Sequence, residues 1–173
     1  MGYTHYWYRE EELDSDNFSN AIKDIALLLS YTEQQEIDAG YAHAKQIVEV
    51  YELNRREINF NGIGEDGHEN FRIADVFKDN YNKDELWKFD FCKTARKPYD
   101  KYVVACLYIF KYHLGDDIKI TSDGDEKDWK EGLQMVQDIL GYPYDIGRFK
   151  LDKSPPIETF YVPEDRGKRK INK

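Results

Sequence analysis

Basic and hydroxyl side chains are concentrated in residues 91–100, whose sequence is FCKTARKPYD. The charged and hydroxyl members of its central stretch are Lys93, Thr94, Arg96 and Lys97. Pro98 suits the first turn of a following helix, and the N–H groups at a helix start lack partners within the helix and so favour an anion. The segment therefore predicts capture of a phosphate or a carboxylate. The alternative, which the sequence leaves open, is a set of surface cations that balances an acidic body.

Two histidines, a carboxylate and a cysteine are the candidates for catalysis. An enzyme built on this sequence would use His5 or His68 as general base, with Asp123 orienting it. Cys92 beside Lys93 is a candidate nucleophile, although a cysteine in a strand is more often a small core residue. The histidines and cysteines show neither i, i+4 nor C-x-x-C spacing, so we expect neither a metal nor a cofactor.

A glycine pattern of the form G-x-G-x-x-G occurs at Gly62, Gly64 and Gly67. After a strand, this pattern would suggest a dinucleotide-binding loop. However, Glu65 and Asp66 would place two carboxylates beside a pyrophosphate, which their charge would repel. We therefore interpret the segment as a flexible glycine-rich loop.

The composition indicates a soluble, acidic protein. The chain has 173 residues and a formal net charge of −9, which argues against nucleic acid as a partner because phosphates require a basic face. Cys92 and Cys106 are too few for a disulfide framework. No secretory signal pattern opens the sequence, and the longest apolar stretch, residues 102–110, is about half of a membrane span. We expect a cytoplasmic protein with no membrane partner.

Hydrophobic periodicity and turn residues divide the chain into strands and helices. Strands are expected at residues 3–9, 57–60, 86–92 and 118–121. Helices are expected at residues 18–29, 98–114 and between a cap at Asp125 and a stop at Gly141. Residues 33–54 show a mixed pattern, in which further helix is favoured by Ala42, Ala44, Ile47 and Val48.

Aromatic residues indicate which faces of these elements are buried. In the strand at 86–92, Trp87, Phe89 and Phe91 alternate with more polar residues, which predicts that the three rings face the core. Trp129 begins the apolar stripe of the last helix and is expected to be buried against the sheet.

The order of the elements fits an α+β domain with the split βαβ plan of ferredoxin-like sheets, mainly antiparallel, with an extra C-terminal helix. We expect one domain over residues 1–150 and a Pro-containing basic tail over residues 151–173. In this plan the strands at 86–92 and 118–121 flank the first strand antiparallel, so its start meets their ends. The residues expected to form a ligand site around this meeting point are Thr4, His5, Tyr6, Trp7, Lys93, Thr94, Arg96, Lys97, Ser122 and Asp123.

Four motifs in the chain carry a resemblance to a known family. They are GYTHYW at residues 2–7, NG at 61–62 followed by HE at 68–69, FCKTARKPYD at 91–100 and SDG at 122–124. Together they resemble a family of small uncharacterised phage and prophage proteins, over roughly residues 2–133. The family brings no established activity with it. The resemblance implies expression from a mobile element in a bacterial host cytoplasm, where small proteins often blunt host defences.

Three hypotheses about function follow. The first is a phage accessory protein, acting in counter-defence, that binds a small anionic ligand such as a nucleotide or a nucleotide-derived signal. Its charge would come from Lys93, Arg96 and Lys97, its hydrogen bonds from Thr94 and Ser122, and its stacking surface from Tyr6 or Trp7. The second is an enzyme, a hydrolase or transferase, acting on such a ligand. The third is an acidic inhibitor that binds a host defence protein, which the net charge supports.

Overall fold

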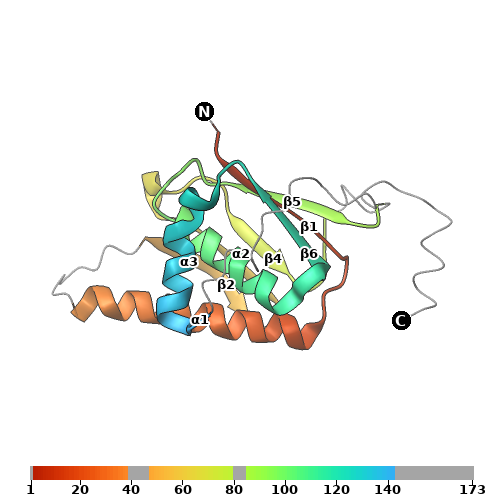
Figure 1. Cartoon of the computed structure of the whole chain (residues 1–173), viewed down its shortest axis with the longest axis horizontal. Coiled ribbons are helices and arrows are strands. Elements are labelled where there is room, and N and C mark those ends of the chain that lie inside the picture. Colours follow the sequence, from red (N-terminus) through yellow and green to blue (C-terminus); the bar gives the residue numbers. More distant parts are fainter. Residues whose placement is uncertain (1, 39–46, 80–84, 143–173) are drawn as a thin grey trace.

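The structure is a computed structural model that describes residues 2–38, 47–79 and 85–142 (Figure 1). Its helices are α1 (Ser15–Asp38), α2 (Asp100–Leu114) and α3 (Glu126–Leu140). Its strands are β1 (Thr4–Arg9), β2 (Val48–Asn54), β3 (Glu57–Gly62), β4 (Phe71–Ala74), β5 (Lys88–Lys93) and β6 (Ile118–Ser122). The α+β class and the helix after the last strand are confirmed. The expected tail at residues 151–173 lies outside the described residues.

The strands form two antiparallel sheets of three strands each, in the orders β5-β1-β6 and β2-β3-β4. The first sheet confirms the predicted neighbours of β1. The split βαβ plan, in which all four predicted strands share one sheet, is wrong, because the strand at 57–60 lies in the second sheet. There β3 pairs with its neighbours in sequence, β2 and β4, through short connections that hold the partners close together.

The second sheet includes two strands that the sequence pattern did not predict. Residues from Val48 onward form β2, where further helix was expected. Most β2 side chains are exposed, and a register shift between Val50 and Glu52 interrupts the alternation along the strand. The expected helical residues Ala42 and Ala44 lie outside the described residues. The short strand β4 buries Phe71 and Ile73 on either side of the exposed Arg72. Its four residues are too few for a periodic signal.

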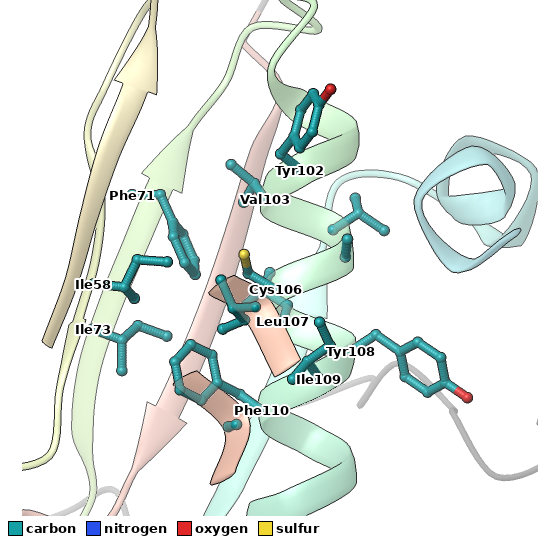
Figure 2. Packing of buried hydrophobic residues seen from close by; sticks show 14 of the residues in the cluster. Ile58, Phe71, Ile73, Tyr102, Val103, Cys106, Leu107, Tyr108, Ile109 and Phe110 are labelled. Atoms are coloured by element: carbon teal, nitrogen blue, oxygen red, sulfur yellow. The ribbon is translucent and has the colours of Figure 1, made fainter. Parts of the chain in front are cut away.

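Helix α2 lies at the centre of the core and is apolar on nearly every side, as expected of a helix packed by neighbours all around. It packs against α1, α3 and β6. Figure 2 shows Leu107 and Phe110 of α2 facing Ile58, Phe71 and Ile73 of the second sheet. The predicted stop of this helix before Gly115 is confirmed. Among the described residues, no helix has both the length and the apolar character needed to cross a membrane.

Helix α3 begins and ends where the sequence predicts. The Asp125 side chain accepts hydrogen bonds from the first-turn N–H groups, and Asp128 completes a capping box. Gly141 closes the helix in the left-handed conformation, with φ 70°. Gly132 lets α3 approach α2 closely, because a Cβ atom there would lie 2.6 Å from Cγ1 of Val104. The predicted burial of Trp129 is also confirmed.

The prediction that the aromatic rings of β5 face the core is wrong for Phe89 and Phe91. Lys88 and Cys92 are buried, whereas Phe91 is 47% exposed and Phe89 is partly exposed. The antiparallel register explains the reversal, because residues paired across strands share one face of the sheet. Lys88, Asp90 and Cys92 pair with Arg9, Trp7 and His5, all of which are buried. Trp87, which lies just before β5, is buried as expected.

The buried Arg9 connects the two sheets. Its guanidinium donates hydrogen bonds to the carbonyl oxygens of Ala74 and of Asp75, the latter at 2.9 Å, at the end of β4. It also donates to the carbonyl oxygens of Glu10 and Glu11, at 2.9 and 3.2 Å. Burial lowers the pKa of Arg9 to about 10, so the side chain keeps its charge at neutral pH. A charged arginine on an inward position therefore joins the end of β1 to the end of β4.

Candidate functional site

The predicted meeting of three strand ends is confirmed. Thr4 lies opposite Lys93, and His5 lies opposite both Cys92 and Ser122. The backbone N–H of Asp123 donates to the Thr4 carbonyl at 3.0 Å, and the Thr4 N–H donates to the Asp123 carboxylate at 2.9 Å. We call residues 2–6, 93–97 and 122–124 the strand-end site. Whether these residues bind a ligand stays a prediction.

The glycine-rich loop at residues 63–70 lies beside the strand-end site. The Lys93 N–H donates to the Glu69 carboxylate at 2.8 Å, and the Glu69 N–H donates to the Lys93 carbonyl at 3.2 Å. Lys97 Nζ donates to the Glu65 carbonyl at 2.8 Å. The loop joins two antiparallel strands, β3 and β4, instead of a strand and a helix, so it lacks the setting of a dinucleotide loop. All four resemblance motifs thus contribute residues at this end of the protein.

A strained turn connects β5 to α2. The Lys97 N–H donates to the Thr94 carbonyl at 3.0 Å, and Ala95 and Arg96 between them have φ of 51° and 56°. Glycine and asparagine favour such left-handed positions, and other residues pay of order 1–2 kcal/mol. The N–H groups of Thr94 and Ala95 both donate to the Tyr3 carbonyl at 3.1 Å, which helps to hold the turn. Strain of this kind collects at functional sites.

The turn presents the Arg96 guanidinium at the surface. Its side chain is 61% exposed, and its Cζ lies 4.0 Å from the centre of the Tyr3 ring. One nitrogen, Nη1, donates to Asp128 at 2.6 Å, and this bond lowers the pKa of the Asp128 carboxyl. Within the described part of the chain, the other N–H groups of Arg96 make no hydrogen bond. They leave an edge that can bind a second anion.

His5 lies at the centre of a buried hydrogen-bonded chain. It is fully buried, with Nδ1 2.9 Å from Ser122 Oγ and Nε2 2.7 Å from Asp100 Oδ1. Ser122 Oγ accepts from the N–H of Gly124 at 2.9 Å and from Trp129 Nε1 at 3.2 Å. Its own proton therefore points to His5 Nδ1, and His5 Nε2–H donates to Asp100. Asp100, not the predicted Asp123, orients the ring.

The hydrogen-bonded chain of Ser122, His5 and Asp100 does not favour His5 as a direct general base. A general base must reach the proton that it removes, whereas the His5 imidazole is fully buried behind its partners Ser122 and Asp100. Thr94 is buried as well, and its hydroxyl donates to Asp100, so neither side chain is open to a ligand. The other predicted base, His68, is exposed on the glycine-rich loop. The catalytic roles of His5, His68 and Asp123 stay predictions.

The two predicted stacking residues face opposite sides of the sheet. Trp7 points inward and is 1% exposed, so its ring cannot stack on a ligand at the surface. The prediction that Trp7 stacks on a ligand is therefore wrong. Tyr6 points outward, and its hydroxyl donates to Asp123 at 3.2 Å. The reversal follows from strand alternation, since successive side chains face opposite sides. Of the two, only Tyr6 can offer a ring to a bound molecule.

The sequence pattern missed an aromatic surface on the same sheet. Phe89 lies 6.3 Å from Tyr6, 5.0 Å from Tyr8 and 5.9 Å from Phe91, between ring centres. We call Tyr6, Tyr8, Phe89 and Phe91 the aromatic face. The predicted pairing of the first strand with the strand at 86–92 could have revealed the aromatic face. Because Trp7 and Phe91 cannot share a face when Tyr6 pairs with Phe91, the register assigns the rings to two sides.

Asp90 lies on the inward face of β5, beside a cavity of about 70 Å³ that Trp7, Arg9 and Phe77 help to line. Its Oδ1 accepts the Phe91 N–H at 2.8 Å. Burial raises the pKa of its carboxyl from 3.8 to about 6. Between pH 3.8 and about 6, the folded protein therefore keeps a proton on Asp90 that the unfolded chain releases. The contribution of Asp90 to the free energy of unfolding falls as the pH rises through about 6.

We expect Asp90→Asn to stabilise the protein at pH 7 by about 1–3 kcal/mol, because it removes the cost of burying a charge while keeping an acceptor for the Phe91 N–H. Urea unfolding at pH 4, 5, 6 and 7 measures the effect. The advantage of the variant should grow with pH, and it should be smallest at pH 4. An advantage that stayed constant across this range would show that Asp90 does not titrate in the folded state as described.

Cys92 and a metal ion are the other candidates for chemistry at this site. Burial raises the pKa of the Cys92 thiol to about 12, which disfavours the thiolate that a nucleophile requires. Among the residues that the structure describes, no group of three or more histidine, cysteine and carboxylate side chains is placed to hold a metal ion.

Comparisons with protein-family models, curated proteins and solved structures find no match for this chain.

Proposed function

We propose that the protein binds a small anionic ligand, such as a nucleotide or a nucleotide-derived signal, at the strand-end site. The observation that carries the proposal is the strained turn that presents Arg96. Two consecutive non-glycine residues adopt left-handed conformations there, and the guanidinium lies exposed with part of its donor set unused. Such strain persists where the surrounding structure enforces it, and functional sites are where that occurs.

The charges around Arg96 suit a phosphate ligand. Arginine offers a planar fork that grips two phosphate oxygens at once, and one Asp128 contact leaves most of that fork available. Lys93, at the end of β5, adds a point charge on the outward side of the sheet. Asp123 is exposed at the start of β1, where its carboxylate accepts from the Thr4 N–H and from the Tyr6 hydroxyl. A ligand with hydroxyl donors as well as phosphate, as in a nucleotide, would use both kinds of partner.

The proposed setting is the cytoplasm of a bacterial host, with the protein acting as a phage accessory factor in counter-defence. A binding protein could there sequester a nucleotide signal that activates a host defence. A second candidate, an enzyme acting on the same ligand, is favoured by the Ser122–His5–Asp100 chain, whose order of donors resembles that of a hydrolase nucleophile and its base. The third hypothesis, an acidic inhibitor of a host defence protein, rests on the net charge alone.

We expect Arg96→Ala to weaken binding of the anionic ligand about ten- to hundredfold, the scale of a hydrogen bond to a charged group, with the fold unchanged. Calorimetric titration with nucleotides, cyclic nucleotides and ADP-ribose derivatives measures the effect. Arg56→Ala is the matched control, because Arg56 is an exposed arginine that pairs with Asp75, away from the strand-end site. Lys168 and Lys170 in the basic C-terminal segment can be replaced as a further control.

The result separates the hypotheses. Binding that is lost with Arg96→Ala and kept with both controls supports the strand-end site. Loss of intact ligand during incubation, abolished by Ser122→Ala, would favour the enzyme. If the wild-type protein binds no member of the panel, the proposed function fails, and pull-down of a host protein would then support the inhibitor hypothesis.

A further inference from the structure

The cavity beside Asp90 is lined by residues of both sheets. Trp7 and Arg9 come from β1, Asp90 comes from β5, and residues 72–74 of β4 and 76–79 complete the wall. The cavity lies toward the end of β1 that is away from the strand-end site. Its volume of about 70 Å³ suits a molecule smaller than benzene, which occupies an engineered cavity of about 150 Å³. The proposed function makes no use of this cavity.

The Trp7 side chain brings an unsatisfied hydrogen-bond donor to the cavity wall. Trp7 is buried, and among the described residues its Nε1–H has no acceptor. An indole nitrogen can only donate, and a buried donor without a partner costs about 1–3 kcal/mol. Such donors are rare in folded proteins, and each one requires an explanation. An acceptor atom on a bound molecule would satisfy the Trp7 donor.

The charges around the cavity favour an anion over a cation. Its described lining includes three cations, Arg9, Arg72 and Lys78, and two carboxylates. Arg72 and Lys78 lie at the exposed rim, where both pair with Glu57. Arg9 differs from them because it is 2% exposed and keeps its charge inside the protein. This buried positive charge would repel a bound cation and attract an anion.

Asp90 is the carboxylate that a bound anion would replace beside Arg9. It pairs with Trp7 in the register, and its charge acts on Arg9 across the inward face. The other carboxylate that acts on Arg9, Asp75, is already paired with Arg56 at 2.9 Å. Because burial raises the pKa of Asp90 to about 6, this side chain becomes neutral more readily than an ordinary carboxyl. A neutral Asp90 would donate a hydrogen bond instead of competing for Arg9.

Each element around Asp90 contributes charged groups to its surroundings. They are Arg9 of β1, Arg72 of β4, Lys88 of β5, and Lys78 and Asp79 of the segment after β4. Burial has the largest influence on the pKa of Asp90, while Asp79 raises it further and Arg9 and Arg72 lower it. An anion in the cavity would add negative charge beside Asp90 and would therefore favour its neutral form.

We propose that this cavity binds the carboxylate group of a small aliphatic acid, which accepts from Trp7 Nε1–H and replaces ionised Asp90 as the counter-charge of Arg9. The proton that neutralises Asp90 comes from solvent, so binding at neutral pH takes up a proton. The side chains of Ile73 and Phe77 provide apolar contacts for a short alkyl chain. This inference concerns a second site and does not depend on the proposed function.

The experiment is calorimetric titration of the whole protein with propionate at pH 6, 7 and 8, in buffers of different ionisation enthalpy. Propionate stays ionised over this range. We expect binding to wild type to weaken about tenfold between pH 7 and 8, with uptake of about one proton per propionate at pH 7, because ionised Asp90 must first be neutralised. Asp90→Asn carries a permanent amide donor in place of the proton. It should bind propionate equally at all three pH values, without proton uptake, and about tenfold or more tightly than wild type at pH 8.

Two further variants test the donor and the specificity of the carboxyl effect. Trp7→Phe keeps a buried ring and removes the N–H, so it should weaken propionate binding about ten- to hundredfold at every pH. Asp116→Asn is the matched control for Asp90→Asn, because Asp116 is a 97% exposed carboxylate outside the cavity lining, and it should bind propionate as wild type does. Thermal unfolding shows whether each variant is folded. If Trp7→Phe does not fold, wild type and Asp90→Asn decide the test alone.

Four results would overturn the inference. Absence of propionate binding at all three pH values would mean that water alone fills the cavity. Equal binding to wild type at pH 6 and pH 8 would mean that Asp90 does not become neutral in the complex. Loss of binding in Asp90→Asn would mean that the ligand requires the carboxylate itself. Binding that Arg96→Ala abolishes and Trp7→Phe retains would assign propionate to the strand-end site.

Discussion

Replacing Trp129 by alanine is expected to lower the free energy of unfolding by about 3–5 kcal/mol, which for a protein of this size corresponds to a melting temperature lower by about 10 °C. Trp129 is 1% exposed, so its removal leaves a large cavity between α3 and the sheet. Its Nε1 donates to Ser122 Oγ at 3.2 Å, and its ring packs edge-on against His5 at 5.3 Å. Urea unfolding monitored by circular dichroism measures the loss.

Two further variants show whether packing causes the effect. Trp129→Phe retains most of the buried volume and loses the donor to Ser122, so its cost should be clearly smaller, at about 1–2 kcal/mol. Tyr51→Ala removes an exposed ring and should leave the unfolding transition unchanged. A Trp129→Ala protein as stable as wild type would contradict the packing of α3 described above.

Elements with local signals were predicted well from the sequence. Asp125 and Gly141 set the ends of α3 through contacts with their own neighbours, and such signals can be recognised in a single sequence. The meeting of Thr4, Lys93 and Asp123 followed from the order of the strands, because an antiparallel pair brings the start of one strand to the end of the other. Much of the candidate site could therefore be assembled before its contacts were known.

Features that depend on distant partners could not be predicted in this way. Because charged residues are rarely buried, the sequence predicts that Lys88 and Asp90 lie on the outward side of β5. Their inward placement depends on β1, about 80 residues earlier in the chain, which brings Arg9 and Trp7 onto the same face. Likewise, the contact of Arg96 with Asp128 joins residues from separate elements. No spacing within either segment indicates it.

The network around the predicted general base shows the same limit. His5 was assigned to the site correctly by position, but its partner Asp100 is 95 residues away and belongs to the first turn of α2. Asp123, which the sequence suggested, instead binds the backbone of Thr4 and the hydroxyl of Tyr6. Sequence order predicted which ends of strands meet. It did not predict which carboxylate turns toward the ring.

Replacing Arg9 by methionine is expected to lower the free energy of unfolding by about 2–4 kcal/mol. Methionine keeps an unbranched side chain of similar length, so the loss comes mainly from the donors that Arg9 directs at the carbonyl oxygens of Ala74 and Asp75. Because those bonds tie β4 to β1, amide hydrogen exchange in residues 71–74 should accelerate more than exchange in α2. Equal acceleration throughout the chain would mean that Arg9 stabilises the protein without joining its sheets.

A double variant distinguishes the charge of Arg9 from its hydrogen bonds. Arg9 lowers the pKa of Asp90, so Arg9→Met leaves that buried carboxylate without a favourable neighbour, and burial then costs more. Adding Asp90→Asn removes the carboxylate charge, and the double variant should be more stable at pH 7 than Arg9→Met alone, by more than Asp90→Asn stabilises wild type. If the two substitutions instead prove additive, the interaction between Arg9 and Asp90 contributes nothing measurable, and the backbone hydrogen bonds of Arg9 account for its whole effect.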